Sequence, residues 1–113
     1  MNNPNGILTA LAVFAAASLG LAGMAQAKPA DCFTTDDGNY PCNFRGTDQA
    51  GSFRVTAPGY PTVTLEVDSP GTAWVFKDFG GGRNTALPGP YYRARDDRAC
   101  WDNPDTGDRL CVW

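Results

Sequence analysis

The chain has 113 residues and a formal net charge of −3, with twelve acidic and nine basic side chains. This mildly acidic balance gives no general attraction to nucleic acids or anionic lipid surfaces, so no nucleic-acid partner is expected. The chain contains no histidine. Every mechanism that uses imidazole as an acid, a base or a metal ligand is therefore excluded.

The N-terminal segment resembles an export signal in its pattern. An uncharged apolar run over residues 7–22 leads into Ala25-Gln26-Ala27 and then into polar sequence. We therefore predict a signal peptide at residues 1–27, cleaved after Ala27, and a single mature domain at residues 28–113. The alternative is a retained membrane anchor, because no lysine or arginine precedes the apolar run. The run is rich in alanine and glycine rather than leucine, which favours cleavage.

Export would place the mature domain in the periplasm or the extracellular space, without a stable membrane anchor. Cysteines in such oxidising compartments usually form disulfides. A domain this small also benefits from covalent links, because short chains bury a limited share of their apolar surface. A lipid anchor would need a cysteine directly after the cut, whereas Cys32 is the fifth residue after Ala27.

From residue 31 onward, short alternations of apolar and polar residues are separated by clusters of Gly, Pro, Asn and Asp. This pattern predicts strands and turns, and no window supports a long amphipathic helix. Eleven of the twelve acidic residues are Asp, which favours turns over helix interiors. We expect an all-β domain, a small antiparallel β-sandwich or barrel of about six to eight short strands, stapled by disulfides.

Residues 51–57 and 62–67 are predicted as partners in a hairpin, because a Pro-Gly-Tyr-Pro turn separates two alternating segments. Residues 73–76 are apolar on both faces of a strand, which predicts a central strand with Trp74 in the core. The side chains of the first two strands that we expect to face the core are Phe53, Val55, Ala57, Val63, Leu65 and Val67.

The next predicted strand, residues 91–95, carries an aromatic residue on each face. Alternation groups Tyr91 with Arg93 and Arg95, opposite Tyr92 and Ala94. We assign the Tyr91 face to the surface, because aromatic rings beside arginines are common in protein interfaces and in sugar-stacking platforms. The predicted ligand-binding residues are Tyr91, Arg93 and Arg95, together with Arg83 of the preceding glycine-rich loop.

Four cysteines allow three connectivities, which spacing alone does not separate. A turn at residues 36–38 would set Cys32 opposite Cys42, and a turn at residues 104–107 would set Cys100 opposite Cys111. We favour these two hairpin disulfides. The two long-range pairings stay open, because closing longer loops would restrict the unfolded chain more strongly.

Several motifs suggest chemistry that their context does not support. The Asp-rich turn at residues 102–108 resembles a calcium loop but lacks the glutamate at the twelfth position, and neither cysteine pair has zinc-site spacing. We therefore expect no metal and no cofactor.

The sequence Gly80-Gly81-Gly82-Arg83 could bind a phosphate through its backbone N–H groups, but a phosphate loop needs a following helix. A hairpin loop is the better interpretation.

Two acidic pairs, Asp96 with Asp97 and Asp102 with Asp105, could supply carboxylates for glycoside hydrolysis. The alternative is ion pairing with neighbouring arginines. No other acid–base apparatus accompanies these pairs, so we do not expect an enzyme.

The sequence thus predicts a small exported non-catalytic binding or inhibitory module, whose partner is a protein or glycan of the cell envelope. Small periplasmic β-barrel inhibitors of lysozyme have a similar size and compartment, although none of their motifs aligns with this chain. The alternative function is structural or stress-related, without a specific ligand. A small hydrolase is the third hypothesis.

Overall fold

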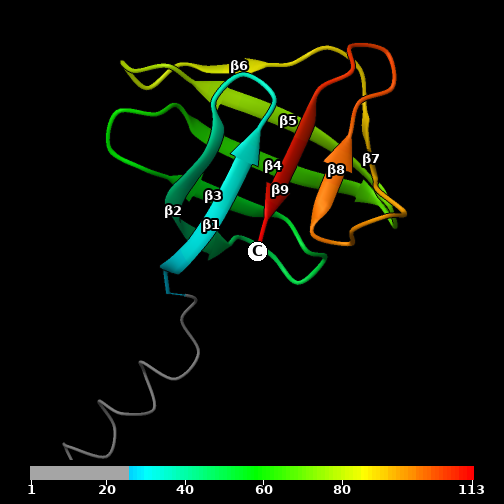
Figure 1. Cartoon of the computed structure of the whole chain (residues 1–113), viewed down its shortest axis with the longest axis horizontal. Coiled ribbons are helices and arrows are strands. Elements are labelled where there is room, and N and C mark those ends of the chain that lie inside the picture. Colours follow the sequence, from blue (N-terminus) through cyan, green and yellow to red (C-terminus); the bar gives the residue numbers. More distant parts are fainter. Residues whose placement is uncertain (1–25) are drawn as a thin grey trace, which may run out of the picture.

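The computed structural model describes residues 26–113. The predicted signal peptide, apart from its last two residues, lies outside this range. Nine β-strands make up the regular structure of the described part (Figure 1). No helix in residues 26–113 has the length and apolar character needed to cross a membrane. The strands are β1 (Lys28–Thr34), β2 (Gly38–Gly46), β3 (Phe53–Thr56), β4 (Thr62–Ser69), β5 (Thr72–Asp78), β6 (Asn84–Ala86), β7 (Tyr91–Arg93), β8 (Cys100–Asp102) and β9 (Arg109–Val112).

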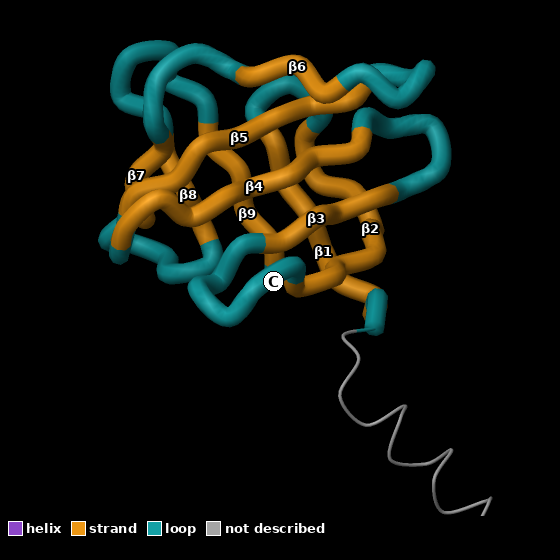
Figure 2. Tube along the Cα trace, turned by 180° about the vertical axis from the view of Figure 1, so that it is seen from behind, coloured by secondary structure: helices purple, strands orange, loops and turns teal. Residues whose placement is uncertain are grey.

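Eight of the strands form a closed antiparallel barrel. Their order around the barrel is β4, β3, β2, β1, β9, β8, β7 and β5, and pairing of β5 with β4 closes the ring (Figure 2). The extra strand, β6, pairs with the end of β5 that β7 does not reach. Closure leaves no long free edge to attract another chain. The predicted all-β fold is confirmed, and of the two expected architectures the structure is the barrel.

The interior is filled by side chains that alternate along the strands. The predicted hairpin of β3 and β4 is confirmed, with Val55 opposite Val63 and Phe53 opposite Leu65, all four buried. Ala57 and Val67, at the ends of this pair, are partly buried and pack against the same core.

Trp74 does not lie in the core. On β5, Ala73, Val75 and Lys77 are buried, whereas Trp74 is 42% exposed on the opposite face. The prediction of a buried Trp74 was wrong because a barrel of one layer has a single interior. A strand in its wall buries one face, even when both faces carry apolar residues.

The two predicted hairpin disulfides, Cys32–Cys42 and Cys100–Cys111, are both present. In the second hairpin, Cys100 lies directly opposite Cys111, as the turn predicted. In the first hairpin the predicted register was wrong, since Cys32 lies opposite Tyr40 and the disulfide runs diagonally between the strands.

Local hydrogen bonds explain the shifted register of the first hairpin. The Thr34 hydroxyl accepts the N–H of Asp37 at 3.1 Å and donates to the Asp37 carboxylate at 3.1 Å. The turn therefore comprises residues 35–37, one residue earlier than predicted. Gly38 has the expected left-handed φ of 71°, but it is the first residue of β2.

We expect the double substitution of Cys100 and Cys111 by alanine to lower the free energy of unfolding by about 3 kcal/mol, because it removes the restraint on the unfolded chain. Urea unfolding measures this loss. The matched control is the same change at Cys32 and Cys42, since the two loops span 11 and 10 residues and should cost nearly the same. A loss below about 1 kcal/mol in both variants would contradict the expectation.

Candidate functional site

The four predicted ligand-binding residues do not form one surface. Tyr91 and Arg93 share a face of β7, as alternation predicted, but that face is turned into the barrel. Tyr91 is 2% exposed, whereas Tyr92 on the other face is 46% exposed. The predicted surface position of Tyr91 was therefore wrong. Its partner across the ladder is the fully buried Ala73, and neighbours in register share a face.

Arg93 lies opposite Trp101 in the ladder between β7 and β8. Its guanidinium carbon lies 4.2 Å from the centre of the Trp101 ring, and Nη1 donates to the Arg98 carbonyl oxygen at 2.6 Å. Arg95 is exposed in the loop after β7, and Arg83 is exposed in the loop between β5 and β6. Arg95 and Arg83 are thus the two predicted residues that remain on the surface.

A small cavity lies among buried side chains of the barrel. Near Lys77 and Tyr91 the structure has a cavity of about 20 Å³, room for roughly one water molecule. Burial, with a smaller contribution from Asp108, raises the pKa of Tyr91 to about 12. Lys77 is buried, with its Nζ 3.4 Å from Oδ2 of the exposed Asp36. This cavity is too small for a ligand larger than water.

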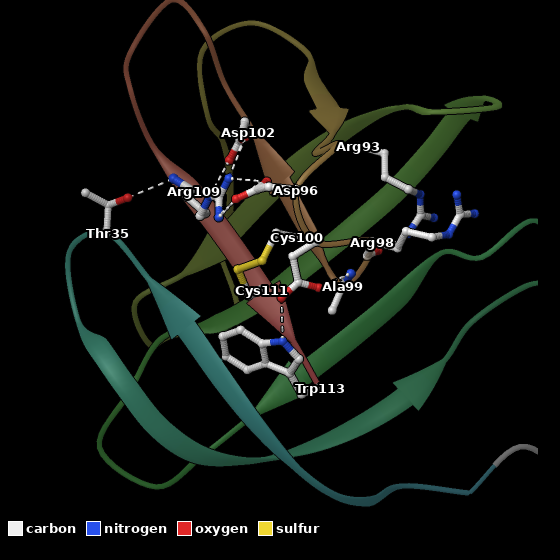
Figure 3. The surroundings of a disulfide bond; sticks show 11 residues. Thr35, Arg93, Asp96, Arg98, Ala99, Cys100, Asp102, Arg109, Cys111 and Trp113 are labelled. Carbon is white, nitrogen blue, oxygen red and sulfur yellow. Dashed lines mark hydrogen bonds and ion pairs between the residues drawn. A yellow bond between two sulfur atoms is a disulfide. The ribbon is translucent and has the colours of Figure 1, made fainter.

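A charged cluster surrounds the Cys100–Cys111 disulfide (Figure 3). The Arg109 guanidinium donates to both oxygens of Asp102, at 2.7 and 3.0 Å, and to both oxygens of Asp96, at 2.9 and 3.1 Å. Asp97 accepts the indole N–H of Trp113 at 2.9 Å and the backbone N–H of Ala99 at 2.9 Å. These bonds hold the loop after β7 against the last hairpin.

Of the two acidic pairs considered for hydrolysis, both members of the first, Asp96 and Asp97, make these contacts, as does Asp102 of the second. Hydrogen bonds from Arg109 lower the pKa of Asp96, and those from Ala99 and then Trp113 lower the pKa of Asp97. Glycoside hydrolysis needs one carboxyl group that is protonated at working pH. The lowered pKa values favour the ionised form of both groups, which is the form that accepts these hydrogen bonds.

The Asp-rich turn of the last hairpin is organised by Asn103, which is 1% exposed. Its side-chain oxygen accepts the N–H groups of Asp105 and Thr106 at 2.9 and 3.3 Å, and its amide donates to the Pro88 carbonyl at 2.6 Å. These contacts give the turn a structural role. Within residues 26–113, no three acidic or cysteine side chains come together as metal ligands.

The described surface has a groove of about 480 Å³ that we call the rim groove. Its two walls are the loop before β4 and the end of β5. Tyr60 stacks on the buried Tyr40, with ring centres 4.1 Å apart and planes at 4°. Phe79 is 70% exposed. The lining residues are Gly59, Tyr60, Pro61, Thr62, Asp78, Phe79 and Gly80.

The sequence analysis did not assign Tyr60 or Phe79 to a site. A usable signal was present, since each is an aromatic residue inside a segment of glycine and proline, where no strand pattern explains it. Arg83 belongs to the same loop as Phe79. Among the four predicted site residues, Arg83 is the nearest in sequence to the residues that line the rim groove.

No family model, curated protein or solved structure matches this chain. Function is therefore inferred from the barrel, the rim groove and the charged cluster.

Lowering the pH should destabilise the protein through the charged cluster. The folded pKa of Asp96 lies below its ordinary value of 3.8. Its stabilising contribution is therefore present above that value and is lost as the pH falls through the folded pKa. We expect Asp96→Asn to be less stable than wild type at about pH 6 and to lose less stability between about pH 5 and pH 2.

Thermal unfolding across this pH range is the measurement. Asp105→Asn is the control, because Asp105 lies in the hairpin that carries Arg109 and its side chain is outside the Arg109 contacts. Equal pH dependence in wild type and Asp96→Asn would show that the Arg109 contact does not stabilise the fold.

Proposed function

We propose that the protein is a small non-catalytic binding module that is exported to the periplasm or the extracellular space and binds cell-envelope glycans through the rim groove. Two disulfides support an oxidising compartment. The predicted signal peptide, cut after Ala27, supports export. The engaged carboxylates of the charged cluster support a role without catalysis.

The observation that carries this proposal is the pair of aromatic side chains, Tyr60 and Phe79, lining one groove. A pyranose ring has an apolar face that packs on aromatic rings, and its hydroxyl groups need polar partners at the edge. Asp78 lies in the same lining, and its Oδ1 accepts the Gly80 N–H at 2.8 Å. Oδ2 of Asp78 can accept a hydrogen bond from a sugar hydroxyl. The groove volume falls in the range of small-ligand sites.

The two walls differ in rigidity. The Tyr60 ring is held by its stack on Tyr40, and the Tyr60 N–H donates to the Ala57 carbonyl at 3.1 Å. Phe79 precedes three glycines with φ values of 122°, 80° and 77°. Such a segment has many accessible conformations. A fixed platform facing an adjustable side chain lowers the ordering cost of binding and tolerates ligands of different shape.

A protein partner is the alternative, and the charged cluster is the observation that favours it. Trp113 is 53% exposed beside a hollow of about 340 Å³ that Phe33 and Arg109 also line. Tryptophan and arginine are enriched among residues that dominate protein interfaces. A binding or inhibitory contact with an envelope protein would use this surface.

We expect Phe79→Ala to weaken binding of envelope oligosaccharides by about tenfold, because one stacking contact is lost. Isothermal titration with defined peptidoglycan fragments and other envelope oligosaccharides measures the affinity. The midpoint of thermal unfolding should stay nearly unchanged, since Phe79 is largely exposed. Trp74→Ala is the matched control, because Trp74 is an exposed aromatic residue on the outer face of β5.

Equal loss of glycan binding in both variants would contradict the rim groove as the site. Absence of glycan binding, with capture of an envelope protein that Trp113→Ala abolishes, would establish the protein-binding alternative instead. If neither glycan nor protein binds, the structural or stress-related function gains support.

A further inference from the structure

Two exposed arginines face each other on the outer surface of the barrel. Arg45 of β2 lies directly opposite Arg54 of β3 in the ladder. Like charges in this position destabilise a sheet, because directly opposed side chains begin about 5 Å apart. The ion pairs within residues 26–113 involve Lys77 and Arg109, so neither Arg45 nor Arg54 is neutralised by an acidic side chain there.

The side chains beside this pair are polar and carry no negative charge. The next outward pair along the same two strands is Asn43 opposite Thr56. These four side chains and Ala27 line a hollow of about 200 Å³. Two guanidinium groups, an amide and a hydroxyl therefore surround one space, and its described lining contains no carboxylate.

We propose that this hollow binds a phosphate group. A guanidinium fork can donate two parallel hydrogen bonds to an oxyanion. Arg109 in this protein already shows that one fork can occupy both oxygens of a carboxylate. A phosphate group has enough oxygens to accept from both arginines at once, and its negative charge would relieve their mutual repulsion.

The site is independent of the rim groove, because the two share no lining residue. Ala27 is the last residue of the predicted signal peptide, so cleavage after it would remove Ala27 from the lining and leave the four strand side chains. If the chain is cut after Ala27, the new amino group of Lys28 would add a third positive charge at the edge of the hollow. This last point depends on the proposed export, whereas the arginine pair does not.

Titration of the purified protein with inorganic phosphate, at constant ionic strength and followed by NMR, tests the proposal. We expect saturable shifts of the Arg45 and Arg54 side-chain signals, and binding at least tenfold weaker in Arg54→Gln. Phosphate should also raise the midpoint of thermal unfolding of wild type but not of Arg54→Gln. Without phosphate, Arg54→Gln should be at least as stable as wild type, because the like-charge contact is gone.

Arg95→Gln is the matched control, since Arg95 is an exposed arginine outside the hollow. An equal loss of phosphate binding in Arg95→Gln, or no saturable shift at Arg45 and Arg54, would overturn the proposal. A second arm uses vesicles containing phosphatidylglycerol. Co-sedimentation that Arg54→Gln abolishes would identify a lipid headgroup as the source of the phosphate, and binding of free phosphate alone would identify a soluble source.

Discussion

The barrel depends on the pairing of its first and last strands, β1 and β9. Three residue pairs make this seam, and backbone hydrogen bonds between Asp31 and Trp113 extend it. Most other pairs of neighbouring strands in the barrel follow each other in the sequence. The pairing of β1 with β9 instead joins the two ends of the domain. The disulfides staple the strands on either side of it, β1 to β2 and β8 to β9. A short seam between distant segments is costly in loop entropy, and these staples restrict the unfolded chain that must form it.

Closure of the barrel also determines which side chains are available to a ligand. Because the interior is packed, the polar groups that reach it, such as Lys77 and Tyr91, surround a space of about 20 Å³. The candidate surfaces for ligands are the rim groove at Tyr60 and Phe79, the charged cluster beside the second disulfide, and the arginine pair on β2 and β3. Each combines a side chain presented by a strand or its end with residues from a neighbouring element.

Local turn chemistry predicted one hairpin correctly and missed the register of the other. The turn before β9 is built on Asn103, and counting outward from it places Cys100 opposite Cys111. In the first hairpin, the Thr34 side chain bonds to Asp37 and moves the turn by one residue. Both disulfides still form, because a diagonal arrangement also brings Cys32 and Cys42 within reach, at 5.9 Å between Cα atoms. The sequence marked Tyr60 and Phe79 as aromatic residues in loops but not as neighbours, since the two loops are brought together only when β4 pairs with β5.

The sequence by itself determined the all-β class and which residues share a face of each strand. Turn chemistry favoured the two cysteine pairs, and the structure shows that they form. Alternation with a period of two is a local property, so Tyr91 and Arg93 could be grouped without knowing the fold. Tertiary structure alone decided which face is inside. Trp74 and Tyr91 exchanged their predicted environments because the inward direction is set by closure of the ring and by the neighbours in register, such as Ala73 beside Tyr91. A strand that carries aromatic residues on both faces contains no local signal that distinguishes them.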